Sequence, residues 1–292
     1  MRSAVLTIGL LTVACGTPDF ETDLLPEGPP EVTLVNVASE SADEAATFCG
    51  APKRNLFYCP ETGDVDAPVA DAPPLGLFVR IAFDELLDPS IETLDVANGT
   101  GSISGSNPVS IECAGTTLAY DGFYQPSGSH LTDPPGPALV IEPTDVIPAG
   151  TNCTISILDS VRDKGGNQVP SAARGPFSFQ LAPFAVVGTN PQDGTEGIDA
   201  DAVLGVVFNN LVDEASLAGR VEVADGGGPV AIDVSVDMTP EDPTSETTVL
   251  IAPSAGTFAV DTSYTVTLSA GIVDQGGAAL AADFVFTFTT GS

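Results

Sequence analysis

The 292-residue sequence contains no tryptophan, one histidine and only 8 lysine and arginine residues. A Ser-His-acid triad would have to use His130, which lies in a Pro/Gly-rich loop over 125–137, and no Gly-x-Ser-x-Gly motif surrounds any serine. The lack of tryptophan also argues against an aromatic platform for glycosidase chemistry. The sequence therefore predicts a protein that is not an enzyme and has no catalytic residues.

The shortage of bases makes the chain strongly acidic. Its 40 Asp and Glu residues give a formal net charge of −32, although only 16% of all residues are charged. Such a surface repels the phosphates of nucleic acids and of anionic lipid headgroups, so we expect no nucleic-acid partner. The acidity is typical of a soluble coat in an extracellular or salt-rich setting, and capture of cations or basic partners is the alternative.

Calcium binding is the cofactor alternative that these carboxylates leave open. Asp199 and Asp201, with Asp193 near them, and the pair Glu241-Asp242 are loop carboxylates of the kind that coordinate hard cations. No stretch has the full EF-hand spacing, and no Cys-x-x-Cys is present for zinc. We therefore predict no metal ligands and no cofactor, with calcium kept as the alternative.

The first residues have the pattern of an export signal. Met1-Arg2 is a short positive region, and Ala4–Val13 is an uncharged apolar run of ten residues. This run is too short to span a bilayer and is typical of a secretory signal. The acidic, Pro-rich stretch 15–30 then predicts a tether between the signal and the folded part.

The signal ends in Leu11-Thr-Val-Ala-Cys15-Gly16, which resembles the lipobox of bacterial lipoproteins, although Thr12 stands where that family usually has Leu. The resemblance implies a signal peptide over 1–14 that is cleaved before Cys15, and acyl chains on Cys15 that attach the protein to a membrane. Gly16, rather than Asp, implies export to the outer membrane or cell surface. An ordinary signal peptide with an incidental cysteine is the alternative.

The end of the chain contains two alternating runs separated by an Asp-x-Gly-Gly turn, and the same unit occurs about 111 residues earlier. A period of two is typical of half-buried strands, and the turn indicates a hairpin. The two copies are Cys153–Ile157, Val161–Gly166 and Phe177–Phe179 in the first, and Tyr264–Ser269, Val273–Gly277 and Phe284–Thr289 in the second.

Short alternating runs with Pro/Gly turns and no long helical period predict an all-β fold of two tandem sandwiches. We place the first domain at 31–182 and the second, with seven strands, at 183–292. The first contains an insertion over 38–74, which is expected to have no counterpart in the second copy. A connection of this length is usually functional or disordered.

Four cysteines remain when Cys15 is set aside, and in an exported protein they imply two disulfides. Three connectivities are possible. We favour Cys49–Cys59, local to the insertion, and Cys113–Cys153, whose side chains share inward faces with apolar neighbours and could meet across the core.

The motif order in the second copy resembles bacterial Ig-like domains of the S-layer (SbsA) type. It includes Pro-x-Asp-Gly, Leu-Ile-x-Pro, Tyr-Thr-Val-Thr-Leu, the Asp-x-Gly-Gly turn and Phe-x-Phe-Thr-Thr. The turn of that family commonly continues with Asn, which the first copy keeps as Asn167 and the second replaces with Ala278. The resemblance implies two Ig-like sandwiches, and it is informative about fold more than about function.

Together these features predict a lipid-anchored envelope protein that uses tandem Ig-like domains as a spacer, display or interaction module. The alternative is a dedicated surface binding protein for a glycan, a peptide or calcium, with the 38–74 insertion and the other loop tips of the first domain as its site. The expected partners are the membrane and a protein or glycan of the envelope.

Overall fold

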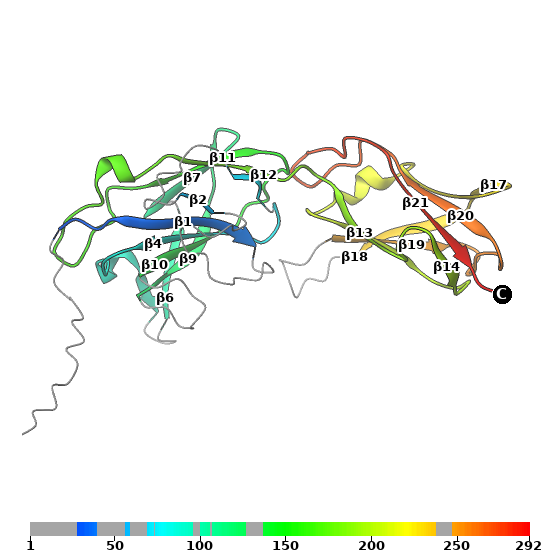
Figure 1. Cartoon of the computed structure of the whole chain (residues 1–292), viewed down its shortest axis with the longest axis horizontal. Coiled ribbons are helices and arrows are strands. Elements are labelled where there is room, and N and C mark those ends of the chain that lie inside the picture. The colour runs from blue at the N-terminus through cyan, green and yellow to red at the C-terminus, as the bar shows by residue number, and fades with distance from the viewer. Residues whose placement is uncertain are drawn as a thin grey trace, which may run out of the picture.

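The computed structural model describes residues 28–39, 56–58, 69–72, 74–95, 100–105, 107–126, 137–237 and 247–292. Within these ranges the regular structure is almost entirely β-strand, interrupted by the single turns of 3-10 helix η1 (Pro89–Ile91), η2 (Ser171–Ala173) and η3 (Glu214–Leu217). Four sheets form two sandwiches that lie end to end along the long axis of the molecule (Figure 1). The predicted all-β class is confirmed.

The first sandwich packs a seven-stranded sheet, in the spatial order β2-β1-β4-β10-β9-β6-β5, against a five-stranded sheet, in the order β3-β12-β11-β7-β8. The strands are β1 (Val32–Ser39), β2 (Leu56–Tyr58), β3 (Val69–Ala72), β4 (Leu77–Phe83), β5 (Thr93–Asp95), β6 (Thr100–Gly105), β7 (Val109–Cys113), β8 (Thr116–Thr117), β9 (Tyr120–Gln125), β10 (Ala138–Pro143), β11 (Asn152–Ile157) and β12 (Phe177–Leu181).

The second sandwich packs a four-stranded sheet, β13-β15-β19-β18, against a five-stranded sheet, β14-β21-β20-β16-β17. Its strands are β13 (Val186–Asn190), β14 (Thr195–Ile198), β15 (Leu204–Phe208), β16 (Val221–Asp225), β17 (Gly228–Val230), β18 (Ile232–Asp237), β19 (Thr247–Pro253), β20 (Ser263–Leu268) and β21 (Phe284–Thr290).

Each sandwich encloses its own hydrophobic core, built from the alternating residues of facing strands. In β20, Tyr264, Val266 and Leu268 are buried, whereas Ser263 before them and Thr265 between the first two are exposed. β20 pairs with β21 in antiparallel register, with Tyr264 opposite Phe288, as the alternating pattern predicts. The exact limits 31–182 and 183–292 stay predictions, and the second core also includes Ala149.

The two sandwiches share an equivalent hydrogen bond at the start of a 3-10 helix. Asp88 begins η1 by accepting the Ser90 N–H at 2.8 Å, and Asp213 begins η3 by accepting the Ala215 N–H at 3.1 Å. The Ser90 backbone N–H holds the pKa of Asp88 below its ordinary value. Both aspartates satisfy a helix-start N–H that has no partner within the helix.

One expectation about the 38–74 insertion is wrong. Its last part forms β3, which joins the five-stranded sheet by parallel pairing with β12. β14 pairs in the same way with β21 of the second sandwich, so this end of the insertion has a counterpart. The sequence signal for β3 and β14 is weak, because each strand has only four residues and lies at the edge of its sheet. In addition, β14 contains Gly197 with a positive φ of 76°.

The chain also changes sheet within two short runs of the sequence that alternate without a break. The run Thr117–Tyr120 divides between β8 in one sheet and β9 in the other, and Val230–Val236 divides between β17 and β18. β18 is the edge strand of its sheet, whereas β9 has β6 and β5 beyond it. The alternation of apolar and polar residues continues through each change of sheet. The sequence therefore does not show the change, because an alternating run does not specify which sheet it joins.

Candidate functional site

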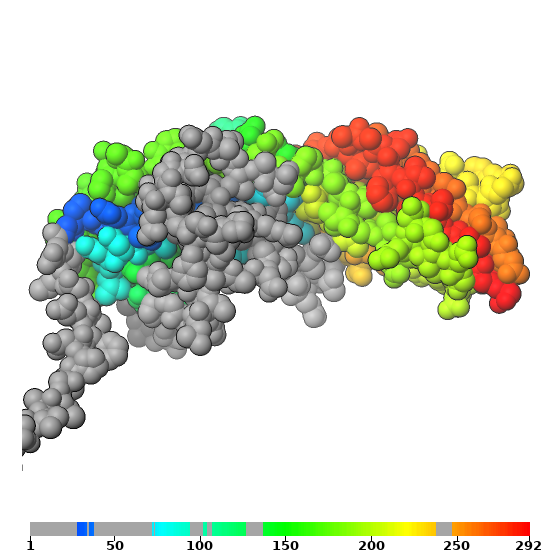
Figure 2. Space-filling view, in the orientation of Figure 1, coloured from blue at the N-terminus to red at the C-terminus, as the bar shows by residue number. Residues whose placement is uncertain are grey.

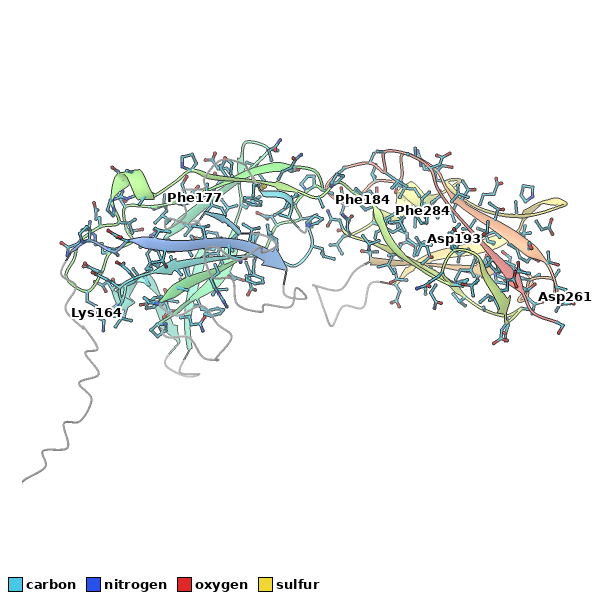
Figure 3. All side chains as sticks on the ribbon, in the orientation of Figure 1. Lys164, Phe177, Phe184, Asp193, Asp261 and Phe284 are labelled. Carbon is cyan, nitrogen blue, oxygen red and sulfur yellow. A yellow bond between two sulfur atoms is a disulfide. The ribbon has the colours of Figure 1, made fainter. Side chains whose placement is uncertain are left out.

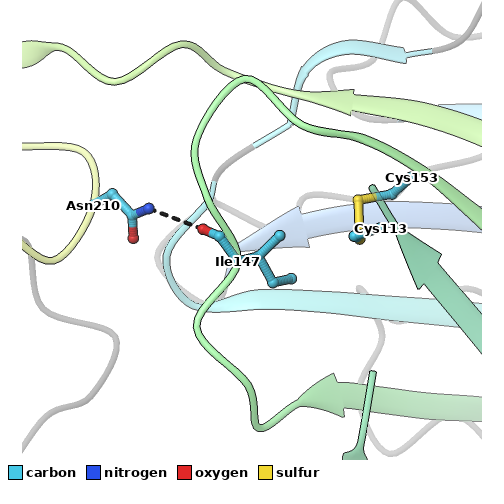
Figure 4. Close-up of a disulfide and its surroundings, with 4 residues drawn as sticks. All are labelled: Cys113, Ile147, Cys153 and Asn210. Carbon is cyan, nitrogen blue, oxygen red and sulfur yellow. Dashed lines mark hydrogen bonds between the residues drawn. A yellow bond between two sulfur atoms is a disulfide. The ribbon is translucent and has the colours of Figure 1, made fainter. Parts of the chain in front are cut away.

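Cys113 and Cys153 form a disulfide between neighbouring strands (Figure 4). They are direct partners on the antiparallel strands β7 and β11, with their Cα atoms 4.2 Å apart, and both side chains are buried in the first core. The bond therefore lies within one sheet and does not cross the core as expected, because inward-facing residues directly opposite on paired strands are already close. Cys15, Cys49 and Cys59 lie outside the described residues.

A fully buried aspartate stands in each Asp-x-Gly-Gly turn. Asp163 is 0% exposed and Asp274 is 1% exposed. The Oδ1 atoms accept the backbone N–H four residues later, from Asn167 at 2.8 Å and from Ala278 at 2.7 Å. The Oδ2 atoms also accept N–H donors. Because all four carboxylate oxygens are occupied by donors, the arrangement supports the turns rather than binding a cation.

Asp193, one of the loop carboxylates considered for calcium, is engaged by the last strand of the chain (Figure 3). Its Oδ1 accepts the Thr287 backbone N–H at 2.8 Å and the Thr287 hydroxyl at 3.0 Å. These bonds lower the pKa of Asp193 from its ordinary value, with the backbone N–H as the larger cause. The carboxylate therefore fastens the loop before β14 to β21.

Among the described residues, Asp199 and Asp201 do not assemble into a calcium site. Asp199 and Asp201 are exposed on the loop after β14. Within the described ranges, no group of three or more His, Cys, Asp or Glu side chains is placed to hold a metal ion. Glu241, Asp242 and His130 lie in parts of the chain that the structure does not describe.

Two tyrosines whose roles the sequence did not indicate connect different parts of the first sandwich. The Tyr120 hydroxyl donates to the Val109 carbonyl at 2.8 Å and accepts the Val109 N–H at 3.0 Å, which ties β9 of one sheet to β7 of the other. Burial raises the pKa of Tyr120 to about 12. The Tyr124 hydroxyl accepts the Leu87 N–H at 2.9 Å. Both hydroxyls are used in holding the fold together.

A buried asparagine connects the second sandwich to the first. Asn210, near the start of the loop after β15, donates its Nδ2–H to the carbonyl of Ile147 in the first sandwich at 3.0 Å (Figure 4). Asn210 is 1% exposed. The sequence pattern carried no signal for this contact, because neither residue belongs to an alternating run.

In the part of the chain that the structure describes, no helix is long and apolar enough to cross a membrane.

A family model matches the second sandwich. Residues 180–290 match the family model of the bacterial Ig-like domain. Two solved structures share 11% and 12% sequence identity with the chain: the N-terminal part of the bacterial S-layer protein SbsC, with a TM-score of 0.25, and domains 4–9 of surface layer protein SbsC, with a TM-score of 0.21. They cover 76% and 77% of this chain, which spans only 43% and 30% of theirs.

No curated protein matches the sequence. The family match runs from the end of β12 to the last residue of β21 and so covers every strand of the second sandwich. From its first strand to its last, the second sandwich is thus similar to the bacterial Ig-like domain.

Proposed function

We propose that the protein is a lipid-anchored protein of the cell envelope that uses its two Ig-like sandwiches as a non-enzymatic spacer or display arm. The observation that carries this proposal is the end-to-end arrangement of the sandwiches (Figure 1). Lys164 lies at one end of the molecule and Asp261 at the opposite end (Figure 3). Gly28, on the segment that enters the first sandwich, lies at the Lys164 end, where its carbonyl accepts the Asn167 side chain at 3.3 Å.

The polar groups of the described residues support a structural role. The buried carboxylates of Asp163 and Asp274 and the hydroxyl of Tyr120 are saturated by backbone and amide donors or acceptors, so each of these three groups supports the fold. The match to the bacterial Ig-like domain is compatible with this role, since such modules serve as spacers, display arms and adhesive pieces in exported proteins. The acidic surface suits an extracellular environment.

The anchor is tested by replacing Cys15 with Ser. We expect the variant to move from the membrane pellet to the soluble fraction, because it cannot receive the acyl chains that make attachment stable. The measurement is cell fractionation, together with the intact mass of the mature N-terminal peptide. Thr12→Leu is the matched control, since it restores the usual lipobox residue and should leave the protein in the pellet. A Cys15→Ser variant that still pellets would contradict the anchor.

The spacer role is tested by comparing the two ends of the molecule. With the lipidated protein on vesicles that contain an acceptor dye among their headgroups, a fluorophore on Lys164→Cys should be quenched more strongly than one on Val260→Cys, next to Asp261. Both positions are exposed. Energy transfer falls steeply with distance, so the quenching of each probe reports its height above the membrane. Equal quenching would mean that the molecule lies flat, and the spacer role would then be wrong.

A further inference from the structure

One loop of the first sandwich is hydrogen-bonded to the second sandwich. This loop, 147–149, follows β10, and its Ala149 N–H donates to Oδ2 of Asp274 at 2.8 Å. The same oxygen accepts Nδ2 of Asn210 at 2.7 Å, and Asn210 in turn reaches the carbonyl of Ile147 (Figure 4). Ala149 is 7% exposed and packs into the core of the second sandwich. In the space-filling view the two sandwiches meet without a gap (Figure 2).

The contact combines a buried carboxylate with close packing. Asp274 lies almost wholly out of water, so loss of the Ala149 N–H would leave part of its charge without a donor, which is unfavourable in a buried site. Gly276 lies against Pro148 so closely that a Cβ added to it would be 2.6 Å from the Pro148 Cα and 2.8 Å from its ring. The two surfaces therefore fit in one orientation, whereas domains that share a small, polar interface ordinarily move relative to each other.

The equivalent turn of the first sandwich is completed differently. There, Oδ2 of Asp163 accepts Nδ2 of Asn167 at 2.9 Å, so a residue of the turn itself satisfies the carboxylate. In the second sandwich the same position is Ala278, whose methyl group has no donor. Oδ2 of Asp274 is left for donors from outside the turn, and Ala149 of the first sandwich and Asn210 supply them.

We propose that Asp274, Asn210 and Gly276 form an orientation lock that makes the two sandwiches one rigid unit. Because Ala278 stands where the first copy has Asn167, Oδ2 of Asp274 has no donor within its own turn and accepts one from the first sandwich. The proposal deepens the spacer function, on which its biological use depends. A flexible joint would let the far end fold back, whereas the lock fixes the distance that the arm can span.

Two substitutions in the full chain test the lock. Gly276→Ala places a methyl group against Pro148, and it leaves the turn itself unstrained because φ of Gly276 is not in the positive region. Ala278→Asn supplies the internal donor that the first sandwich already uses, and so competes with the Ala149 N–H for Asp274. The matched control is Gly188→Ala in β13, where an added Cβ meets Val207 at an ordinary 3.7 Å.

The measurement is amide ¹⁵N relaxation, which reports the rotational tumbling of each sandwich. We expect one shared tumbling time in the wild type and in Gly188→Ala. In Gly276→Ala and Ala278→Asn the two sandwiches should tumble separately, with shorter times. Separate tumbling in the wild type, or shared tumbling in Ala278→Asn, would overturn the lock. The relaxation experiment contains no membrane, whereas the quenching experiment measures height above one, so failure of the lock and failure of the spacer role are read from separate measurements.

Discussion

Replacing both Cys113 and Cys153 with Ala should lower the free energy of unfolding of the first sandwich by about 4 kcal/mol. The disulfide joins residues 40 positions apart, and cutting it restores conformational freedom to a loop of that length in the unfolded chain. Since the bond joins β7 to β11 in the middle of the five-stranded sheet, its loss acts on the core and not on a loop tip.

The effect is best measured by native-state amide hydrogen exchange, which resolves the two sandwiches separately. The second sandwich is the internal control, because its core contains neither cysteine and its protection should be unchanged. Substitution is preferable to reduction, since a reductant would also act on the predicted Cys49–Cys59 bond. Unchanged protection of β7 and β11 in the double variant would show that the disulfide adds nothing to stability.

Phe288→Ala should destabilise the second sandwich by about 3–5 kcal/mol. Phe288 is 1% exposed, and it stacks on Tyr264 with ring centroids 5.1 Å apart and meets the edge of Phe258 at 5.4 Å. Deleting its ring removes buried apolar area, opens a cavity and breaks two aromatic contacts.

The control for this variant lies on the same strand. Val285 is 52% exposed on the opposite face of β21, so Val285→Ala should change stability by no more than about 0.5 kcal/mol. Hydrogen exchange of the β20 and β21 amides measures both variants. If the two substitutions had equal effects, Phe288 would not be part of a packed core.

Much of the fold could be predicted from local pattern. In β20 and β21 the alternation of apolar and polar residues specifies which side chains are buried, and the Asp-x-Gly-Gly turns mark the two copies. The reason is that a strand with one buried face requires a period of two, a property of the chain that does not depend on its neighbours.

The sites were less predictable, because their partners come from distant parts of the sequence. The loop carboxylates suggested calcium, yet Asp193 is held by Thr287, 94 positions later. Asn210 and Asp274 meet the first sandwich across 63 and 125 positions. Such contacts leave no periodic trace in the sequence, so only the folded chain reveals them.

By itself the sequence determined the all-β class, the duplication and the inward faces of the main strands, since these follow from alternation and turn chemistry within short segments. Only the tertiary structure decided which sheet each short edge strand joins, and that Cys113 and Cys153 bridge one sheet. It also decided that Phe78 and Ala82, on the face of β4 turned away from the core, are buried at 6% and 2% exposure. Each of these outcomes depends on which distant segment lies alongside, and that is settled by how the whole chain packs.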